Sequence, residues 1–136
     1  MSRRLFELIL SIKRKCQSNE EQIQDELGLS QAEFNGLIVL EPGQKILGFD
    51  FADRMGLSPS RGSRVLNKLV TEGYVKTQVK ADDRRTVLIG LTAKGTRKKK
   101  RILGRMEACE NRISAKLTKR QIGQIRSALS LLEEAL

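Results

Sequence analysis

Histidine and tryptophan are absent from this 136-residue chain, which also has only one Tyr, two Pro and two Cys. Because His is the commonest metal ligand and general base, its absence disfavours metal centres and catalytic triads. Cys16 and Cys109 lie far apart without a CxxC motif, so neither a zinc ribbon nor a disulfide framework is indicated. The sequence contains no recognisable nucleophile–base pair or phosphate-binding loop. We therefore predict a chain that is not an enzyme and that uses no metal and no cofactor.

Long apolar runs are also missing, since no stretch of the sequence is long enough to span a bilayer. The N-terminus places basic residues before an apolar segment, but Glu7 interrupts that segment and Lys13 ends it. We interpret this region as an amphipathic helix and not as a signal peptide. Together with the sparse cysteines, this predicts a cytoplasmic protein with no membrane partner. A basic helix lying on a membrane surface is the alternative interpretation.

The net charge of +10 is distributed unevenly along the chain. Residues 54–105 carry 15 Lys and Arg against three Asp and Glu, whereas the other residues carry 11 basic and 13 acidic side chains. A basic field confined to one part of a chain is typical of a surface that binds a polyanion, most often nucleic acid. The alternative is a basic surface that serves solubility alone.

Helical signals fill the first half of the chain. Apolar residues at helical spacing predict a first helix over about residues 3–27, ended by Gly28. The capping box from Ser30 to Glu33 opens a second helix, and a short third helix is expected over residues 49–55. Ser58 and Pro59 then start a fourth helix, over about residues 59–72. The third and fourth helices meet across a very short turn, which is the spacing of a helix-turn-helix.

The fourth helix has one apolar side and one basic, polar side. At 3.6 residues per turn, its apolar side consists of Gly62, Val65, Leu66, Leu69 and Val70. The polar side carries Ser60, Arg64, Asn67, Lys68 and Thr71, with Arg61 and Ser63 at its flanks, and the first acid is Glu72. Arg, Lys, Asn and Ser are the side chains that bond base edges and phosphates. This composition predicts a DNA-binding face, with an ordinary solvated face as the alternative.

Two alternating segments follow, Tyr74–Lys80 and Thr86–Leu91, and they predict a β-hairpin whose tip spans residues 81–85. Arg84 and Arg85 lie near that tip, where they are suited to a narrow A·T minor groove. Asp83 is placed to pair with an arginine and stiffen the tip. The alternative is a polar turn that keeps the strand edge soluble.

The last third of the chain predicts two more helices. Thr92 to Gly95 caps the first of these, and its opening run Arg97–Arg101 is expected to be largely exposed, because consecutive helical residues cannot share one face. This run faces either DNA backbone or solvent. Apolar stripes follow in both helices, and a second capping box at Thr118 separates them. One small domain cannot cover these stripes and that of the first helix, so we expect pairing with a second copy.

Six helices with a central helix-turn-helix and a hairpin wing, in this order, resemble the MarR (multiple antibiotic resistance regulator) family of bacterial transcription regulators. The matching segments are FADRMGLSPSRGSRV (51–65), LVTEGYV (69–75), DRR (83–85) and LTAKG (91–95). The resemblance implies a mainly α fold with a small β-hairpin wing. It divides the chain into an N-terminal dimerisation helix (1–29), a winged helix-turn-helix DNA-binding domain (30–95) and C-terminal dimerisation helices (96–136).

The same resemblance implies a homodimer that binds double-stranded DNA at a pseudo-palindromic operator, usually as a repressor. The major groove or its flanking phosphates would be contacted by Ser58, Ser60, Arg61, Ser63, Arg64 and Lys68. In the wing, Arg84 or Arg85 would reach the minor groove and Asp83 would orient it. Half-sites for a symmetric dimer should lie one helical turn apart, roughly 34–36 Å.

Members of this family often release DNA in response to a signal, and the resemblance implies the same for this chain. A small-molecule effector is one candidate partner, although the chain offers few aromatic side chains for a stacking pocket. Cys16, in the first helix, is the candidate redox sensor, with an inert apolar role in a helix stripe as its alternative. Three other functions compete with a regulator: a non-specific architectural DNA- or RNA-binding protein, a protein–protein winged-helix module, and an enzyme.

Overall fold

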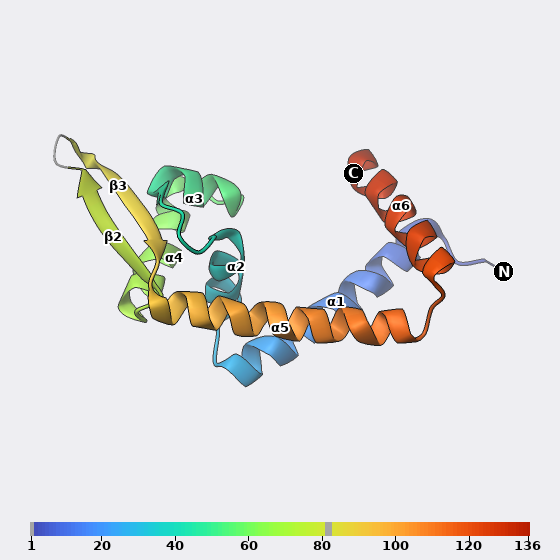
Figure 1. Ribbon diagram of the computed structural model, residues 1–136. Coiled ribbons are helices and arrows are strands. Elements are labelled where there is room, and N and C mark those ends of the chain that lie inside the picture. Colours follow the sequence, from blue (N-terminus) through green and yellow to red (C-terminus); the bar gives the residue numbers. More distant parts are fainter. Residues whose placement is uncertain (1, 81–82) are drawn as a thin grey trace. The chain divides into compact units, whose positions relative to one another are not determined.

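The computed structural model describes residues 2–80 and 83–136, with the side chains of residues 80–86 outside the description. The chain divides into two compact units, residues 1–102 and residues 103–136. The elements, in order, are α1 (Leu5–Leu27), α2 (Gln31–Val39), β1 (Ile46–Leu47), α3 (Gly48–Arg54), α4 (Pro59–Thr71), β2 (Val75–Lys80), β3 (Asp83–Leu91), α5 (Ala93–Ala115) and α6 (Lys119–Ala135). The prediction of six helices with a hairpin wing is confirmed (Figure 1).

The ends of the helices follow the caps that the sequence indicated. Gly28 ends α1 in the left-handed region, at φ 66°. Ser30 Oγ accepts from the backbone N–H of Glu33 while the Glu33 carboxylate accepts from that of Ser30, so both halves of the predicted capping box form. Thr118 and Gln121 make the same reciprocal pair at the start of α6. These local bonds satisfy backbone donors that the first turn of a helix leaves without partners.

A three-stranded antiparallel sheet has the order β1-β3-β2. Val75 of β2 lies opposite Leu91 of β3, and the regular register continues to Val79 opposite Val87. The sequence did not predict β1, whose two residues are too few to show a periodic pattern. It also began the second wing strand at Thr86, whereas β3 begins at Asp83. The ladder shifts register between Val79 and Lys80, so the wing is irregular near its tip.

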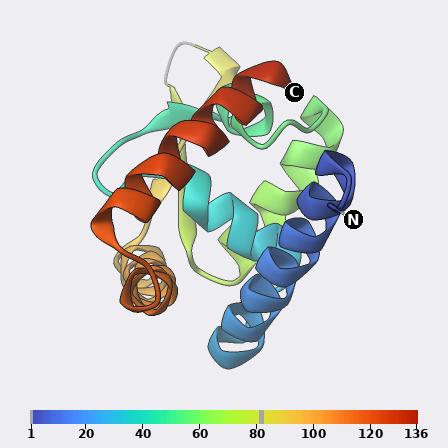
Figure 2. The same ribbon diagram turned by 90° about the vertical axis from the view of Figure 1, so that its right-hand side faces the viewer.

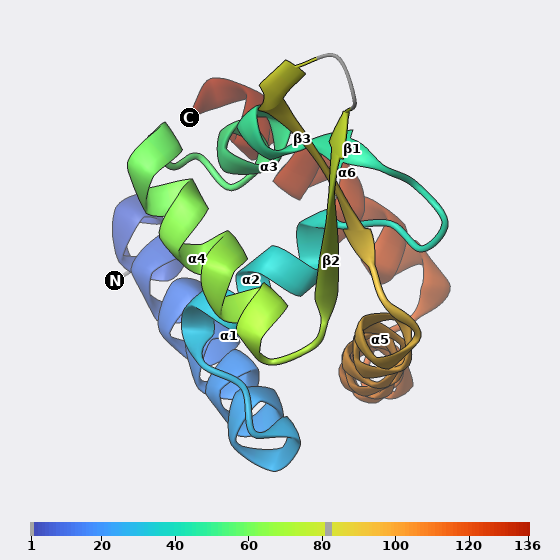
Figure 3. The ribbon, with the colours of Figure 1, turned by 90° about the vertical axis from the view of Figure 1, so that its left-hand side faces the viewer.

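The hydrophobic core of the first unit lies between α2, α3, α4 and the sheet. α1 packs beside α2 (Figure 2), and α4 lies across α2 with one edge against β2 (Figure 3). The largest side chains with almost no exposed surface are Leu37, Leu40, Phe51, Leu69, Ile89 and Ile102. Burying one such side chain contributes roughly 1.5–3 kcal/mol to folding. This core holds α4 with its apolar side inward.

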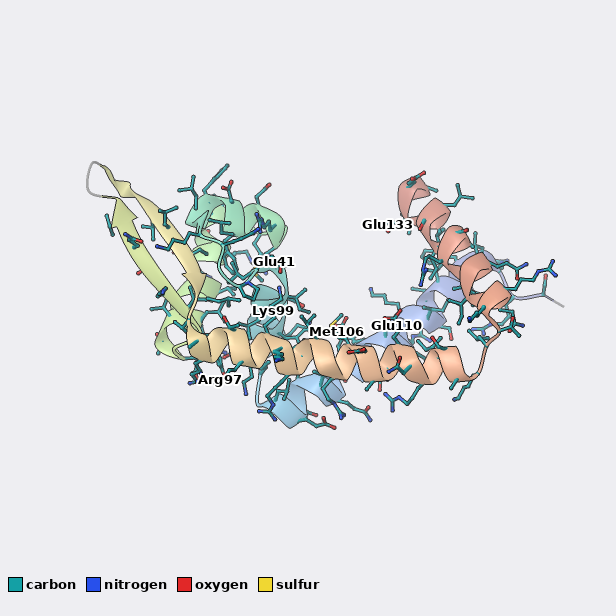
Figure 4. The ribbon with its side chains drawn as sticks, in the orientation of Figure 1. Glu41, Arg97, Lys99, Met106, Glu110 and Glu133 are labelled. Atoms are coloured by element: carbon teal, nitrogen blue, oxygen red, sulfur yellow. The ribbon has the colours of Figure 1, made fainter. Side chains whose placement is uncertain are left out.

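The predicted exposure of the basic run at the start of α5 is wrong for one of its residues. Lys99 is 3% exposed, and its ammonium donates to the backbone carbonyls of Ile38 and Leu40 and to the Glu41 carboxylate. Figure 4 shows Lys99 pointing from α5 toward Glu41, with Arg97 on another side of the helix. A lysine is tolerated inside when acceptors replace its water shell, and the end of α2 and the two residues that follow it supply them.

Residues 103–136 keep their apolar stripes uncovered within one chain. α6 has no buried residue, and large apolar side chains of α5, of α6 and of the residue after α6 are exposed, namely Leu103, Met106, Ile113, Ile125, Leu129, Leu131 and Leu136. In the other unit, α1 likewise exposes Leu5, Phe6, Leu8 and Ile12. Apolar surface of this extent marks an interaction site.

Candidate nucleic-acid interface

The turn between α3 and α4 is fixed by backbone bonds. Gly56 adopts φ 67°, and its N–H donates to the Asp53 carbonyl at 2.9 Å. The N–H of Leu57 donates to the Ala52 carbonyl, also at 2.9 Å. Ser58 then caps α4, because its Oγ accepts from the Arg61 N–H at 3.3 Å. The predicted helix-turn-helix is confirmed, and Ser58 has a structural role at its start.

Gly62 lets α3 and α4 approach closely. A Cβ placed on Gly62 would overlap the Ala52 side chain and would lie 2.9 Å from the Ala52 Cα. Leu66 and Leu69 are buried on the same side of α4, and Val65 is half-buried. Val70, expected on the apolar side, is 37% exposed. The apolar side is therefore narrower than predicted, and its contact with α3 fixes the rotation of α4 about its axis.

Every residue predicted for the DNA-reading face is exposed. These residues are Ser58, Ser60, Arg61, Ser63, Arg64, Asn67 and Lys68. The face contains hydroxyl, amide, guanidinium and ammonium groups, with no acidic residue between Pro59 and Thr71. Such a surface offers hydrogen-bond donors and positive charge to a partner that carries acceptors and negative charge.

Arg61 and Arg64 border a hollow of about 400 Å³ between α2 and α4. Gln31 and Asn35 line its opposite side. A chain of amide hydrogen bonds orients them, because Gln24 Nε2 donates to Gln31 Oε1 at 2.9 Å and Gln31 Nε2 donates to Asn35 Oδ1 at 3.1 Å. Sequence reasoning missed these two residues. Their i,i+4 spacing on α2 was the available signal.

Lys68 differs from its neighbours because it also binds inward. Its ammonium lies 3.5 Å from Glu33 Oε1 and 3.4 Å from Ser30 Oγ, at the start of α2. Burial acts to raise the pKa of Glu33, but hydrogen bonds from the Ser30 backbone and hydroxyl, together with the charge of Lys68, outweigh it and hold that pKa below its ordinary value. Lys68 therefore joins α4 to α2 while about half of its side chain stays exposed.

A second hollow, of about 570 Å³, separates α4 from the sheet. Ser63 and Asn67 line it from α4, and Phe49, Thr77 and Val79 line it from α3 and β2. Phe49 is 71% exposed and Val79 is 53% exposed. This hollow gives one edge of the candidate face an apolar border, which the sequence did not suggest.

The wing residues are only partly described. The backbone of Asp83, Arg84 and Arg85 belongs to β3, so these residues lie in a strand and not in the predicted turn. Their side chains lie outside the described residues, as do residues 81–82 of the predicted tip. The contacts proposed for them stay predictions.

The other candidate sites of the sequence have simple surroundings. Cys16 is exposed on α1, and Cys109 is partly exposed with Arg112 Nη2 at 3.1 Å from its Sγ. Over the described residues, His, Cys, Asp and Glu nowhere gather in groups of three that would suit a metal ion. Within that same part of the chain, every helix is too short or too polar for a bilayer crossing.

Comparison with known proteins agrees with this geometry. The sequence model of the family described as the winged helix DNA-binding domain matches residues 43–95, which run from the α2–β1 connection to the first turn of α5. Among curated proteins, no sequence matches this chain.

Solved structures match over nearly the full length. MarR from E. coli is 19% identical, with a TM-score of 0.76 and coverage of 97% of this chain and 98% of that one. A MarR-like transcription regulator from Bacillus cereus is 23% identical, with a TM-score of 0.79 and coverage of 97% and 95%. A MepR mutant from S. aureus, bound to an oligodeoxyribonucleotide, is 18% identical, with a TM-score of 0.69 and coverage of 98% and 99%. The resemblance to the MarR family is thus confirmed at the level of the fold.

Proposed function

We propose that this chain is a sequence-specific, double-stranded DNA-binding transcription regulator of the MarR type. The observation that carries the proposal is the exposed, acid-free face of α4, held outward by a buried apolar side within a winged-helix domain. A helix of this kind fits the major groove, where each base pair presents a distinct pattern of donors, acceptors and methyl groups.

In this proposal the residues of α4 divide the work. Ser60, Arg61, Ser63, Arg64 and Asn67 reach base edges, because they are exposed and can donate to purine acceptors. Ser58 and Lys68 contact flanking phosphates, because both are exposed and each can donate to a phosphate oxygen. In the wing, Arg84 or Arg85 enters the adjacent minor groove, and Asp83 orients the wing.

We further propose that the chain acts as a homodimer through residues 1–29 and 96–136, with residues 30–95 as the DNA-binding domain. The exposed apolar side chains of α1, α5 and α6 support this division, because a second copy would remove them from water. A symmetric dimer would recognise a pseudo-palindromic operator with half-sites roughly 34–36 Å apart. We propose that the DNA-bound dimer represses transcription. We also propose that a small molecule, or oxidation of the exposed Cys16, releases it from DNA.

The MepR mutant, similar to this chain over nearly its whole length, was solved with an oligodeoxyribonucleotide, which supports DNA as the partner. The purified protein, at micromolar concentration, should first be used to select the DNA fragments of the source genome that it binds. Labelled selected duplex should then compete against random duplex and hairpin RNA at physiological salt. We expect a preference of at least about a thousandfold for the selected duplex, the lower range for specific DNA-binding proteins.

The same experiment separates the main alternative, a non-specific architectural DNA- or RNA-binding protein. That alternative predicts a specificity ratio near one with strong salt dependence, because phosphate contacts alone would supply the affinity. A protein–protein module would show neither property. A ratio near one would therefore overturn the regulator proposal even if binding to DNA is tight.

A further inference from the structure

Three lysines at the start of α5 each bind the C-terminal end of a different helix. The last carbonyls of an α-helix lack N–H partners and carry partial negative charge, so a cation is favoured there. The three contacts are Lys94 Nζ to the Glu72 carbonyl after α4 at 2.7 Å, Lys98 Nζ to the Leu27 carbonyl of α1 at 2.7 Å, and Lys99 Nζ to the Ile38 carbonyl of α2 at 3.0 Å. We name these three residues the lysine clamp.

Two of the three lysines are withdrawn from solvent, whereas Lys94 is exposed. Lys99 is 3% exposed and gains two further acceptors, the Leu40 carbonyl and the Glu41 carboxylate. Lys98 is half-buried, and its pKa is lowered, mainly by burial and secondly by the nearby positive charges of Arg101 and Lys94. A lysine whose ammonium has exchanged water for backbone acceptors has fewer donors for an outside phosphate.

The junction between α4 and α5 brings Lys94 to the end of the recognition helix. Thr92 Oγ1 donates to the Gly73 carbonyl at 2.6 Å and accepts from the Gly95 N–H at 3.0 Å. Gly95 packs directly on the Tyr74 carbonyl, where a Cβ would overlap backbone atoms. The Lys94 ammonium also lies 4.9 Å from the centroid of the Tyr74 ring. The start of α5 and residues 72–74, which directly follow α4, are therefore joined by side-chain, backbone and cation–π contacts.

We propose that Lys94, Lys98 and Lys99 are positioning residues for DNA binding, which fix α4 against α1 and α2 through α5 and do not themselves bind phosphate. This inference rests on the proposed function. It gives Lys98 and Lys99 a role inside the protein, whereas the basic run Arg97–Arg101 was predicted from the sequence to face DNA backbone or solvent. It also connects α4 with α1 and α5, which, like α6, carry exposed apolar residues.

Lys94 provides the test, because its side chain is exposed and its loss should leave the protein folded. Affinity for the selected duplex is measured from low to moderate salt for wild type, Lys94→Met and Lys94→Arg. We expect Lys94→Met to bind about tenfold more weakly, the scale of one helix-terminus interaction in each of two protomers. The slope of log affinity against log salt should not change, because no phosphate contact is lost. Lys94→Arg, which keeps a cation near Glu72, should recover most of the affinity.

Two results would overturn the proposal. If Lys94→Met lowers the salt slope by about one for each protomer, the lysine binds phosphate directly. If Lys94→Met binds DNA as tightly as wild type, the contact has no positioning role. Lys100→Met is the matched control, since Lys100 is exposed in the same stretch of α5.

A readout without DNA separates this inference from the proposed function. Amide hydrogen exchange at residues 70–74 should be faster in Lys94→Met than in wild type, because the end of α4 loses its cation. If wild type binds no duplex, the proposed function fails and the positioning role in DNA binding fails with it. The exchange rates then decide whether the clamp holds α4. Unchanged exchange would refute the clamp itself.

Discussion

Adding one methyl group at Gly62 tests how closely α4 must lie against α3. Alanine is favoured over glycine inside a helix by about 1 kcal/mol, so propensity alone predicts stabilisation. The new Cβ, however, would overlap the Ala52 side chain and would lie 2.9 Å from the Ala52 Cα, which is backbone. An ordinary carbon–carbon contact is about 3.5–4.0 Å, so α4 must move by roughly 1 Å.

Overpacking of this kind costs about 1–3 kcal/mol, which exceeds the gain in propensity. We therefore expect Gly62→Ala to lower the free energy of unfolding by about 1 kcal/mol. Displacement of the reading helix should also weaken binding to the selected duplex. Urea unfolding at one protein concentration measures the first effect, and titration of labelled duplex measures the second.

Gly104→Ala is the matched control, because among the described residues of one chain no atom lies within 4 Å of a Cβ placed there. This variant should gain up to about 1 kcal/mol. The double variant Ala52→Gly with Gly62→Ala should recover part of the lost stability, since one of the overlapping methyl groups is gone. The reasoning is refuted if Gly62→Ala is as stable as wild type or follows Gly104→Ala upward.

Four further predictions concern DNA binding by α4 and the wing, the loss of stability at acidic pH, and dimer formation. Arg64→Ala should cost about 1–3 kcal/mol of DNA binding and relax preference at one base pair, which binding to a mutated operator series would reveal. Arg85→Ala should weaken binding chiefly at A·T-rich flanks, and equal loss on G·C flanks would contradict minor-groove entry. Glu33 has a folded-state pKa below its ordinary value of 4.5, so its stabilising effect is fully present above 4.5 and is lost as pH falls through the lower folded-state pKa. Urea midpoints measured against pH should fall less steeply for Glu33→Gln than for wild type. Leu129→Glu should yield monomers in sedimentation at micromolar concentration, and an unchanged sedimentation coefficient would place the dimer contact elsewhere.

Local signals explain why the helices were predictable. Ser30, Ser58 and Thr118 each accept from a backbone N–H three residues ahead, and this bond depends only on residues within one turn. The two sides of α4 were equally readable, because helical spacing alone assigns them. Gly56 marked the turn, since its φ of 67° strains other residues.

Features that depend on distant partners were not predictable. Lys99 reads as a solvated residue in a basic run, and only the fold brings carbonyls some 60 positions earlier to its ammonium. The bond between Lys68 and Glu33 likewise joins separate helices. Ile46 and Leu47 form a strand only because β3 pairs with them. The extra residues of β3 are charged, and charge gives no strand signal before the pairing is known.

Because Lys99 is buried, the chemical reactivity of its amine reports how often the contact between α5 and α2 opens. An acylating reagent can modify it only when the first turns of α5 separate from α2, so the rate of labelling reports how often that separation occurs. Lys100, the next residue and an exposed one, supplies the reactivity of an open amine in the same chain. The ratio of the two rates gives a protection factor for one helix contact, read by mass spectrometry without any introduced probe.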